Sequence, residues 1–313
     1  MFLSEYEDLY LNMHSNSLFT HDEARGMLYI EGETSILDVF FPGIGMNHKV
    51  FISSFAILSR NQRIKNWTLA LTLSGFNQFV ENNSSGNRNP FTEGQQVTNA
   101  AQAILDFCIA NKITSINLFG FSYGADLLCG IASKFIEIRN YNKIEIEKMV
   151  FSDINLNTKT AFLTGKIADI EETMAEKEVI DKKLEFIKLV LENSKDDNEK
   201  LLDNLEYLRA SYKVNWEQMV VSSISAYNYS STRVKEIINF LNTNKNIKTI
   251  FIVSNREING EENGYRKGIE NIIKNTTRFY KQEPEYIETK KHFDGISYTT
   301  LSKVNNFFRG LMW

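Results

Sequence analysis

Short runs of aliphatic, β-branched and aromatic residues alternate along most of the chain with longer stretches in which apolar residues recur at helical spacing. The runs with strand character are residues 36–41, 67–73, 115–119, 148–152, 247–253 and 284–289. The stretches with helical spacing are residues 48–64, 94–111, 123–139, 231–244, 265–274 and 299–309. This alternation predicts an α/β fold, with a mostly parallel sheet covered by helices on both faces. Residues 1–34 are expected to add an antiparallel edge.

The alternation stops at residues 158–230, which are rich in charged residues and contain no run with strand character. Two apolar stripes at helical spacing lie within this segment: Leu184, Ile187 and Leu191, then Leu201, Leu205, Leu208 and Tyr212. A helical pair packed on the core and a cap over a pocket both fit this pattern. The cap is favoured, because the segment follows the strand that ends near Asp153, at the sheet edge where ligands bind in open α/β folds. We therefore expect a core made of residues 1–157 and 231–313, with residues 158–230 inserted as a helical cap.

Composition and charge narrow the range of functions. Of the 313 residues, 42% are hydrophobic, which is enough for a sizeable core, and no stretch is rich enough in proline, glycine or serine to be a flexible linker. The 35 basic and 39 acidic residues give a net charge of −4 without a long basic block. Nucleic acid is therefore not an expected partner.

The N-terminal residues and the cysteines favour an intracellular protein. The first residues are acidic and no apolar run is long enough to cross a bilayer, so we expect a cytoplasmic location and no transmembrane segment. Cys108 and Cys129 both fall in apolar helical stretches and are expected in the core. No metal or cofactor is expected, because the four histidines are dispersed and no carboxylate pattern has the spacing of a metal site. The oligomeric state stays open.

The strongest chemical signal is the motif Gly120-Phe121-Ser122-Tyr123-Gly124, which lies between a predicted strand and a predicted helix. A serine on such a sharp turn brings its two flanking positions against neighbouring backbone, so both must be small. The turn also places Ser122 at a helix N-terminus, where the positive end of the dipole favours the negative charge of an acyl-transfer transition state. The motif therefore indicates that Ser122 is a nucleophile.

With this motif and this order of elements, the chain resembles the α/β-hydrolase superfamily from about residue 36 to its C-terminus, without matching a particular subfamily. The resemblance implies a mostly parallel, eight-stranded sheet with the nucleophile after the fifth strand, an acid after the seventh and a histidine after the eighth. It also implies a helical cap after the sixth strand, which agrees with the place of residues 158–230.

The same resemblance implies an oxyanion hole made of main-chain N–H groups. In the family, the turn after an early strand usually reads His-Gly and contributes the N–H that follows the glycine. Carried over to Pro42-Gly43-Ile44-Gly45, the donors are the N–H of Ile44, or alternatively of Gly45, together with the N–H of Tyr123. Pro42 stands where the family has histidine, which changes how the loop is supported but leaves the main-chain donor in place.

His292 and an acid complete the catalytic triad that the resemblance implies. His292 follows the last predicted strand, where the family places its general base, and the other three histidines are expected as surface or capping residues. Glu257 follows the strand 247–253 by a few residues and would orient His292. Asp153, after the preceding strand, is the alternative acid, because some members of the family take their acid from that turn.

These residues predict a serine hydrolase that cleaves a carboxylic ester or an acyl-thioester through an acyl-enzyme on Ser122. The expected substrate is a small molecule or a carrier-bound acyl chain. The same triad would serve an acyltransferase that passes the acyl group to an alcohol, amine or thiol, and a non-catalytic ligand-binding module is a further alternative. The loop of residues 74–91 either shapes the pocket rim or is a polar surface loop.

Overall fold

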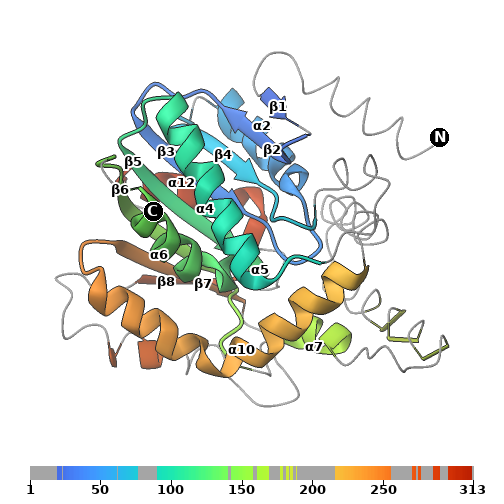
Figure 1. The fold of residues 1–313 in the computed structure, drawn as a ribbon. Helices are drawn as coiled ribbons and strands as arrows, with labels where there is room; N and C mark the ends of the chain where they lie inside the picture. Colours follow the sequence, from blue (N-terminus) through green and yellow to red (C-terminus); the bar gives the residue numbers. More distant parts are fainter. Residues whose placement is uncertain are drawn as a thin grey trace, which may run out of the picture.

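The computed structural model describes residues 20–22, 24–61, 63–76, 90–139, 142–157, 161–168, 216–254, 285–289 and 295–311, with short helical pieces between residues 177 and 188 and between 270 and 275. Within these residues the chain forms one sheet with helices on both faces (Figure 1). The predicted α/β architecture is therefore confirmed.

Among the residues described, the sheet has eight strands, the number expected from the sequence. Its members are β1 (Thr20–Asp22), β2 (Met27–Ile30), β3 (Ile36–Phe41), β4 (Trp67–Leu71), β5 (Ser115–Phe121), β6 (Glu145–Ser152), β7 (Lys248–Ser254) and β8 (Glu285–Thr289). They lie in the order β1-β2-β4-β3-β5-β6-β7-β8. β2 runs antiparallel to β1 and β4, and the remaining neighbours are parallel. The mostly parallel, eight-stranded sheet and its antiparallel edge are thus as predicted.

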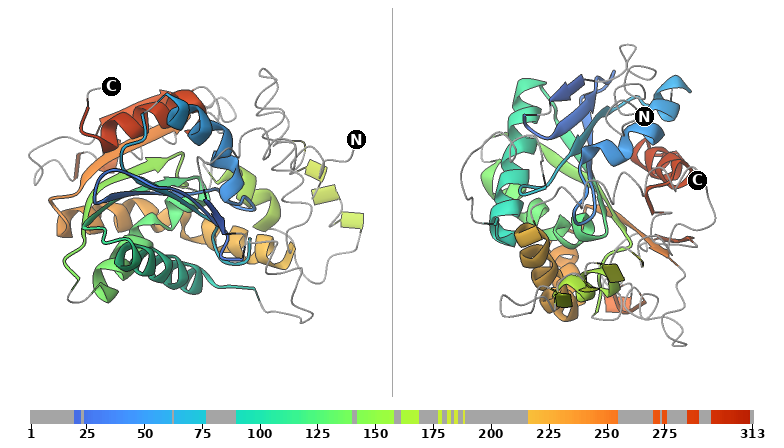
Figure 2. Two further views of the ribbon diagram at one scale, coloured as in Figure 1. Left: turned by 90° about the horizontal axis from the view of Figure 1, so that it is seen from above. Right: turned by 90° about the vertical axis from the view of Figure 1, so that its right-hand side faces the viewer.

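Helices form a layer on each face of the sheet. One layer holds the 3₁₀ turn η1 (His48–Phe51), α2 (Ile52–Arg60) and α12 (Tyr298–Phe308). The other holds α4 (Glu93–Ala110), α5 (Tyr123–Asp126), α6 (Leu128–Ile138) and α10 (Trp216–Thr243), and α7 (Phe162–Ala168) packs against α10. Figure 2 shows the sheet between these layers. Because the parallel strands end at one edge, the turns that follow them meet there.

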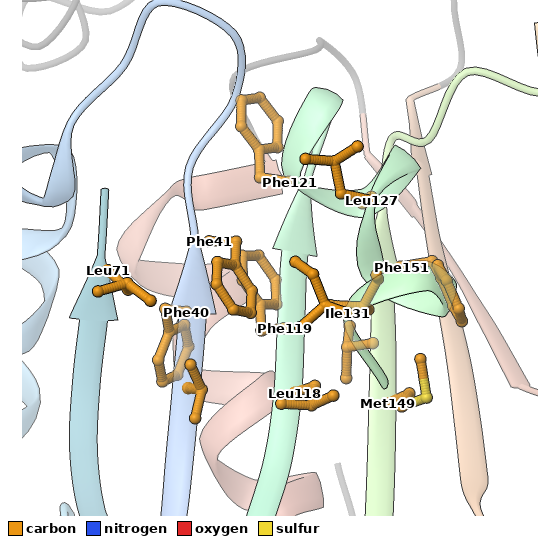
Figure 3. Close-up of a cluster of buried hydrophobic side chains, with 14 of the residues drawn as sticks. Phe40, Phe41, Leu71, Leu118, Phe119, Phe121, Leu127, Ile131, Met149 and Phe151 are labelled. Carbon is orange, nitrogen blue, oxygen red and sulfur yellow. The ribbon is translucent and has the colours of Figure 1, made fainter. Parts of the chain in front are cut away.

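Alternating side chains of the central strands build the core. Phe40 of β3 contacts the rings of Phe55 and Phe308 on the face covered by α2 and α12. Leu118 of β5 points to the opposite face, where Ile131 of α6 belongs to the same buried cluster (Figure 3). Fully burying a side chain of this size stabilises the fold by about 1.5–3 kcal/mol. These contacts hold the strand ends, and so the turns after them, in fixed positions.

α10 begins earlier than the sequence predicts. It runs without interruption from Trp216 to Thr243, so the expected boundary between residues 230 and 231 falls inside one helix. Serine and threonine often begin helices, but here the Ser230 hydroxyl donates to the Tyr227 carbonyl at 2.7 Å and the Thr232 hydroxyl to a carbonyl three residues earlier at 3.0 Å. Both hydroxyl groups therefore donate to carbonyl groups of the same helix and do not end it. The division of the chain into core and cap stays a prediction.

His48 corrects the expectation of a surface or capping histidine. It is buried at the start of η1, where Asn47 caps the turn and His48 Nδ1 lies 2.8 Å from the Thr72 hydroxyl. Burial lowers the pKa of His48 to about 3, so the imidazole is neutral. Cys108 and Cys129 are buried free thiols, as predicted.

Candidate active site

Ser122 occupies the sharp turn between β5 and α5. Its backbone has φ +52° and ψ −120°, and a positive φ is uncommon for a residue other than glycine. A strained conformation of this kind costs about 1–3 kcal/mol and persists only where the surrounding structure enforces it. The serine of the motif therefore lies on the strand-to-helix turn after the fifth strand, in a strained conformation.

The glycines on either side of Ser122 allow the turn to close. A Cβ at Gly120 would lie 2.6 Å from the Gly124 carbonyl oxygen, and a Cβ at Gly124 would lie 2.5 Å from the Pro42 carbonyl oxygen. Both distances are shorter than real Cβ contacts, and the atoms that would be struck are backbone. Neither position accepts a side chain without movement of the main chain.

Backbone hydrogen bonds hold the turn from both sides. The Ser122 N–H donates to the Ser152 carbonyl at 2.7 Å, and the Ser122 carbonyl accepts from the N–H groups of Ala125 (2.8 Å) and Asp126 (3.0 Å). The Tyr123 N–H is the first of α5, and the first N–H groups of a helix have no acceptor within it. The Tyr123 N–H therefore lies next to Ser122 with no acceptor inside α5.

The turn after β3 lies against Ser122. A Cβ at Gly43 would come within 3.3 Å of the Ser122 Cβ. The next glycine, Gly45, has φ +70°, and the Met46 N–H closes the turn onto the Gly43 carbonyl at 3.2 Å. Ile44 and Gly45, the two alternative donors of the predicted oxyanion hole, therefore belong to the turn that borders Ser122.

The structure describes one of the two candidate acids. Asp153 directly follows β6, is buried and has φ +52°. Its N–H donates to a carbonyl of β7 at 2.7 Å, and the residue before it, Ser152, accepts the N–H of Ser122. Asp153 is therefore held beside the Ser122 turn. Glu257, after β7, and His292, after β8, lie outside the described residues.

The chain after β8 returns to the Ser122 turn. The Ser152 hydroxyl donates to the Gly295 carbonyl at 3.3 Å, and a Cβ at Gly295 would lie 3.0 Å from the Phe121 ring. Gly295 comes three residues after His292, and three residues of chain span at most about 11 Å. Gly295 is therefore fixed against the neighbours of Ser122.

Two glutamines that the sequence did not single out make hydrogen bonds near the site: Gln96 borders the Ser122 turn, and Gln218 ties α10 to Phe91. The Tyr123 hydroxyl donates to Gln96 Oε1 at 2.7 Å, and Gln96 Nε2 donates to the Ser74 carbonyl at 2.7 Å. Gln218 of α10 accepts the Phe91 N–H at 2.7 Å and donates to the Phe91 carbonyl at 3.0 Å. Burial raises the pKa of Tyr123, so its hydroxyl stays a neutral donor. Gln96 lies at the start of the buried face of α4, one turn before Ala100, a position that could have revealed it. No such pattern in the sequence points to Gln218.

Around Ser122 the structure brings together the turn of residues 42–45, the start of α5 and the residue Asp153. Within the described part of the chain, no group of three or more His, Cys, Asp or Glu side chains could hold a metal ion. None of the helices described has both the length and the apolar character that crossing a membrane requires.

Comparison with known proteins bears on the fold. No protein-family model matches the chain, and no curated protein matches its sequence. Several solved structures do match. MGS-M2, an α/β hydrolase enzyme from a Medee basin deep-sea metagenome library, is 16% identical with a TM-score of 0.54 and covers 92% of this chain and 95% of its own. MenH from S. aureus is 12% identical with a TM-score of 0.56, covering 91% of this chain and 97% of its own.

A thermophilic esterase from Thermogutta terrifontis is 10% identical with a TM-score of 0.56, covering 91% of this chain and 92% of its own. The three likenesses span nearly the whole of each protein. The chain therefore has the α/β-hydrolase fold.

Proposed function

We propose that this protein is a serine hydrolase that cleaves a carboxylic ester or an acyl-thioester through an acyl-enzyme on Ser122. The observation that carries the proposal is the backbone of Ser122, with φ +52° in a turn that closes only because Gly120 and Gly124 lack side chains. Strain of this kind clusters at active sites. The likeness in fold to hydrolases, one of them an esterase, supports the same class of reaction.

In the proposed reaction, Ser122 Oγ attacks the acyl carbonyl carbon while His292 takes the hydroxyl proton. The carbonyl oxygen becomes an oxyanion, which the N–H groups of Tyr123 and of Ile44, or alternatively Gly45, stabilise. Collapse of this intermediate breaks the bond to the leaving group, which departs with the proton from His292. Water then attacks the acyl-enzyme as His292 removes its proton, and the carboxylic acid and free Ser122 result.

The triad is completed by His292 and an acid. The fixed position of Gly295, against Ser152 and three residues after His292, supports His292 as the general base. We assign the acid to Glu257, three residues after the end of β7, where it would fix the tautomer of His292 and stabilise the imidazolium. Asp153 is the alternative, because it is buried directly after β6.

We also propose that residues 158–230 cover the pocket as a cap. α7 and the first half of α10 lie together in Figure 1, and the two helices pack against each other. Gln218 joins the start of α10 to Phe91, which lies just before α4. The described helices of this segment therefore border the carboxyl edge of the sheet, where a cap would enclose a small or carrier-bound acyl substrate.

Hydrolysis of p-nitrophenyl esters and of acyl-thioesters of matched chain length tests the proposal. For Ser122→Ala we expect kcat to fall by about 10³-fold or more, with an unchanged circular dichroism spectrum. Hydrolysis by Ser122→Ala at the wild-type rate would refute the proposal. Formation of a new ester when an alcohol is added would show that the protein is an acyltransferase instead.

A further inference from the structure

Asp126 belongs to the Ser122 turn, yet the proposed reaction gives it no task. It is the last residue of α5, and its N–H donates to the Ser122 carbonyl at 3.0 Å. Its side chain is buried, with 1% of the residue exposed. Aspartate is almost never fully buried unless its carboxyl group is paired. The partners of Asp126 therefore indicate what it does.

The carboxyl group of Asp126 is bonded twice to the segment that leaves β6. Its Oδ1 accepts the backbone N–H of Asn155 at 2.8 Å, and its Oδ2 accepts from Asn155 Nδ2 at 2.6 Å. The same segment is also tied to the turn through the bond from the Ser122 N–H to the Ser152 carbonyl. The Ser122 turn and residues 152–155 are therefore joined at two separate places, and Asp153 lies between them.

A buried arginine of α10 acts on the same carboxyl group through its charge. The Arg233 side chain, 2% exposed, pairs with Glu236 at 2.9 Å and with Glu93, the first residue of α4, at 3.7 Å. Burial raises the pKa of Asp126 to about 7, and the positive charge of Arg233 is the strongest opposing influence. Arg233 thus joins α10 to α4, and its charge favours the ionised form of Asp126.

Stability alone does not explain such a cluster. Moving charges out of water costs several kcal/mol per ion, and apolar residues of similar volume in place of a buried ion pair are often as stable or more stable. The hydrogen bonds between Asp126 and Asn155 add geometry, because two bonds, one to each carboxyl oxygen, fix both the distance and the orientation of the partner.

We propose that Asp126 is a positioning residue, which holds residues 152–155 in place against the Ser122 turn and thereby sets the rate at which Ser122 attacks. This inference rests on the proposed function, since it concerns the same reaction. The held segment contains Asp153, the alternative acid, and leads from Asn155 into the predicted cap. A misplacement of about 1 Å in such a segment can lower a rate by about 100-fold without any change to a catalytic group.

Labelling of Ser122 by a fluorophosphonate, followed by intact-protein mass, measures attack by the serine without knowledge of the substrate. Asp126→Ala removes both bonds to Asn155, and we expect its labelling rate constant to fall about 10- to 100-fold. Asp126→Asn keeps an oxygen for the Asn155 N–H and regains the second bond when the Asn155 carboxamide turns over, so it should recover most of the rate. In ester hydrolysis kcat should follow the same order with KM little changed, because Asp126 contacts no substrate.

Asp38→Ala is the matched control. Asp38, in the middle of β3, is a buried carboxyl that accepts from Asn117 Nδ2 at 2.7 Å and Asn66 Nδ2 at 3.1 Å. Burial raises its pKa to about 7, as for Asp126. Asp38→Ala should lower the melting temperature as Asp126→Ala does, and it should leave the labelling rate per folded molecule unchanged. The comparison separates positioning of the site from loss of stability.

Each outcome decides between the claims. If Asp126→Ala is labelled as fast as the wild type, or if Asp126→Asn recovers none of the lost rate, the positioning role is overturned. A wild type that is not labelled at all would refute the proposed function itself. If Asp126→Ala does not fold, Asn155→Ala removes one of the two bonds and is expected to show a smaller loss of the same kind; a normal rate in that variant would also overturn the inference.

Discussion

At the scale of the residue, the account depends on the space around Ser122. Gly124→Ala would drive a Cβ to 2.5 Å from the Pro42 carbonyl oxygen, so we expect lower stability and the loss of most labelling of Ser122. Gly94→Ala is the control, because a Cβ there meets nothing within 4 Å and alanine should stabilise α4 by up to about 1 kcal/mol. Urea unfolding and labelling measure both effects. If Gly124→Ala and Gly94→Ala had the same free energy of unfolding and the same labelling of Ser122, the steric argument would be contradicted.

The choice of acid is also a question about single residues. If Glu257 orients His292, Glu257→Gln should lower kcat by up to about 10⁴-fold, because the histidine loses its correct tautomer. The kcat of Asp153→Asn should then fall far less. Ester hydrolysis by the two variants, compared over a range of pH, measures the difference. The reverse order would assign the acid to Asp153.

Ser122 could be found from the sequence, and Asp126 could not. The spacing of Gly120, Ser122 and Gly124 reflects a local steric requirement, so it is visible in any chain that makes this turn. Asp126 and its partner Asn155 are 29 residues apart and meet only after β5 and β6 lie side by side. The sequence around each of the two residues therefore contains no pattern that predicts their hydrogen bonds.

At the scale of the element, apolar runs located the strands well. β3 covers Ile36–Phe41 as predicted, and β5 and β6 extend the predicted runs by a few residues. A continuous apolar run is a strong signal for a strand that is buried between two helical layers. The start of α10 escaped prediction because polar residues that usually mark helix ends, such as Ser230, bond to carbonyls inside this helix.

The attachment of α10 to the core gives a prediction at this scale. Gln218 satisfies both the N–H and the carbonyl of Phe91, so Gln218→Ala should lower the free energy of unfolding by about 1–3 kcal/mol. Asn228→Ala, at an exposed position on the same helix, should change it by no more than about 0.5 kcal/mol. Urea unfolding measures both. A normal stability for Gln218→Ala would show that α10 is held by other contacts.

At the scale of the whole molecule, buried carboxyl groups make stability depend on pH. Burial raises the pKa of Asp38 from 3.8 to about 7, so between these values the folded chain holds a proton that the unfolded chain has lost. Stability from this group is therefore present at low pH and lost as the pH rises through about 7. Asp38→Asn should make the fall in unfolding free energy between pH 5 and 7 shallower by about 1.4 kcal/mol per pH unit. An unchanged slope in urea unfolding would show that Asp38 is ionised in the folded state.

The fold as a whole followed from the order of elements and from one motif, because a parallel sheet with connecting helices has few possible arrangements. The surroundings of the site did not follow in the same way. Gln96 reaches Tyr123 from α4, and Asn155 reaches Asp126 from the segment after β6. Such contacts depend on tertiary structure and leave no trace in local sequence.

We propose that Ser122 is an activated nucleophile, and intact-protein mass after incubation with a fluorophosphonate tests this role without knowledge of the substrate. We expect one adduct on the wild type and none on Ser122→Ala. An unlabelled wild type, or the same adduct on both proteins, would contradict it.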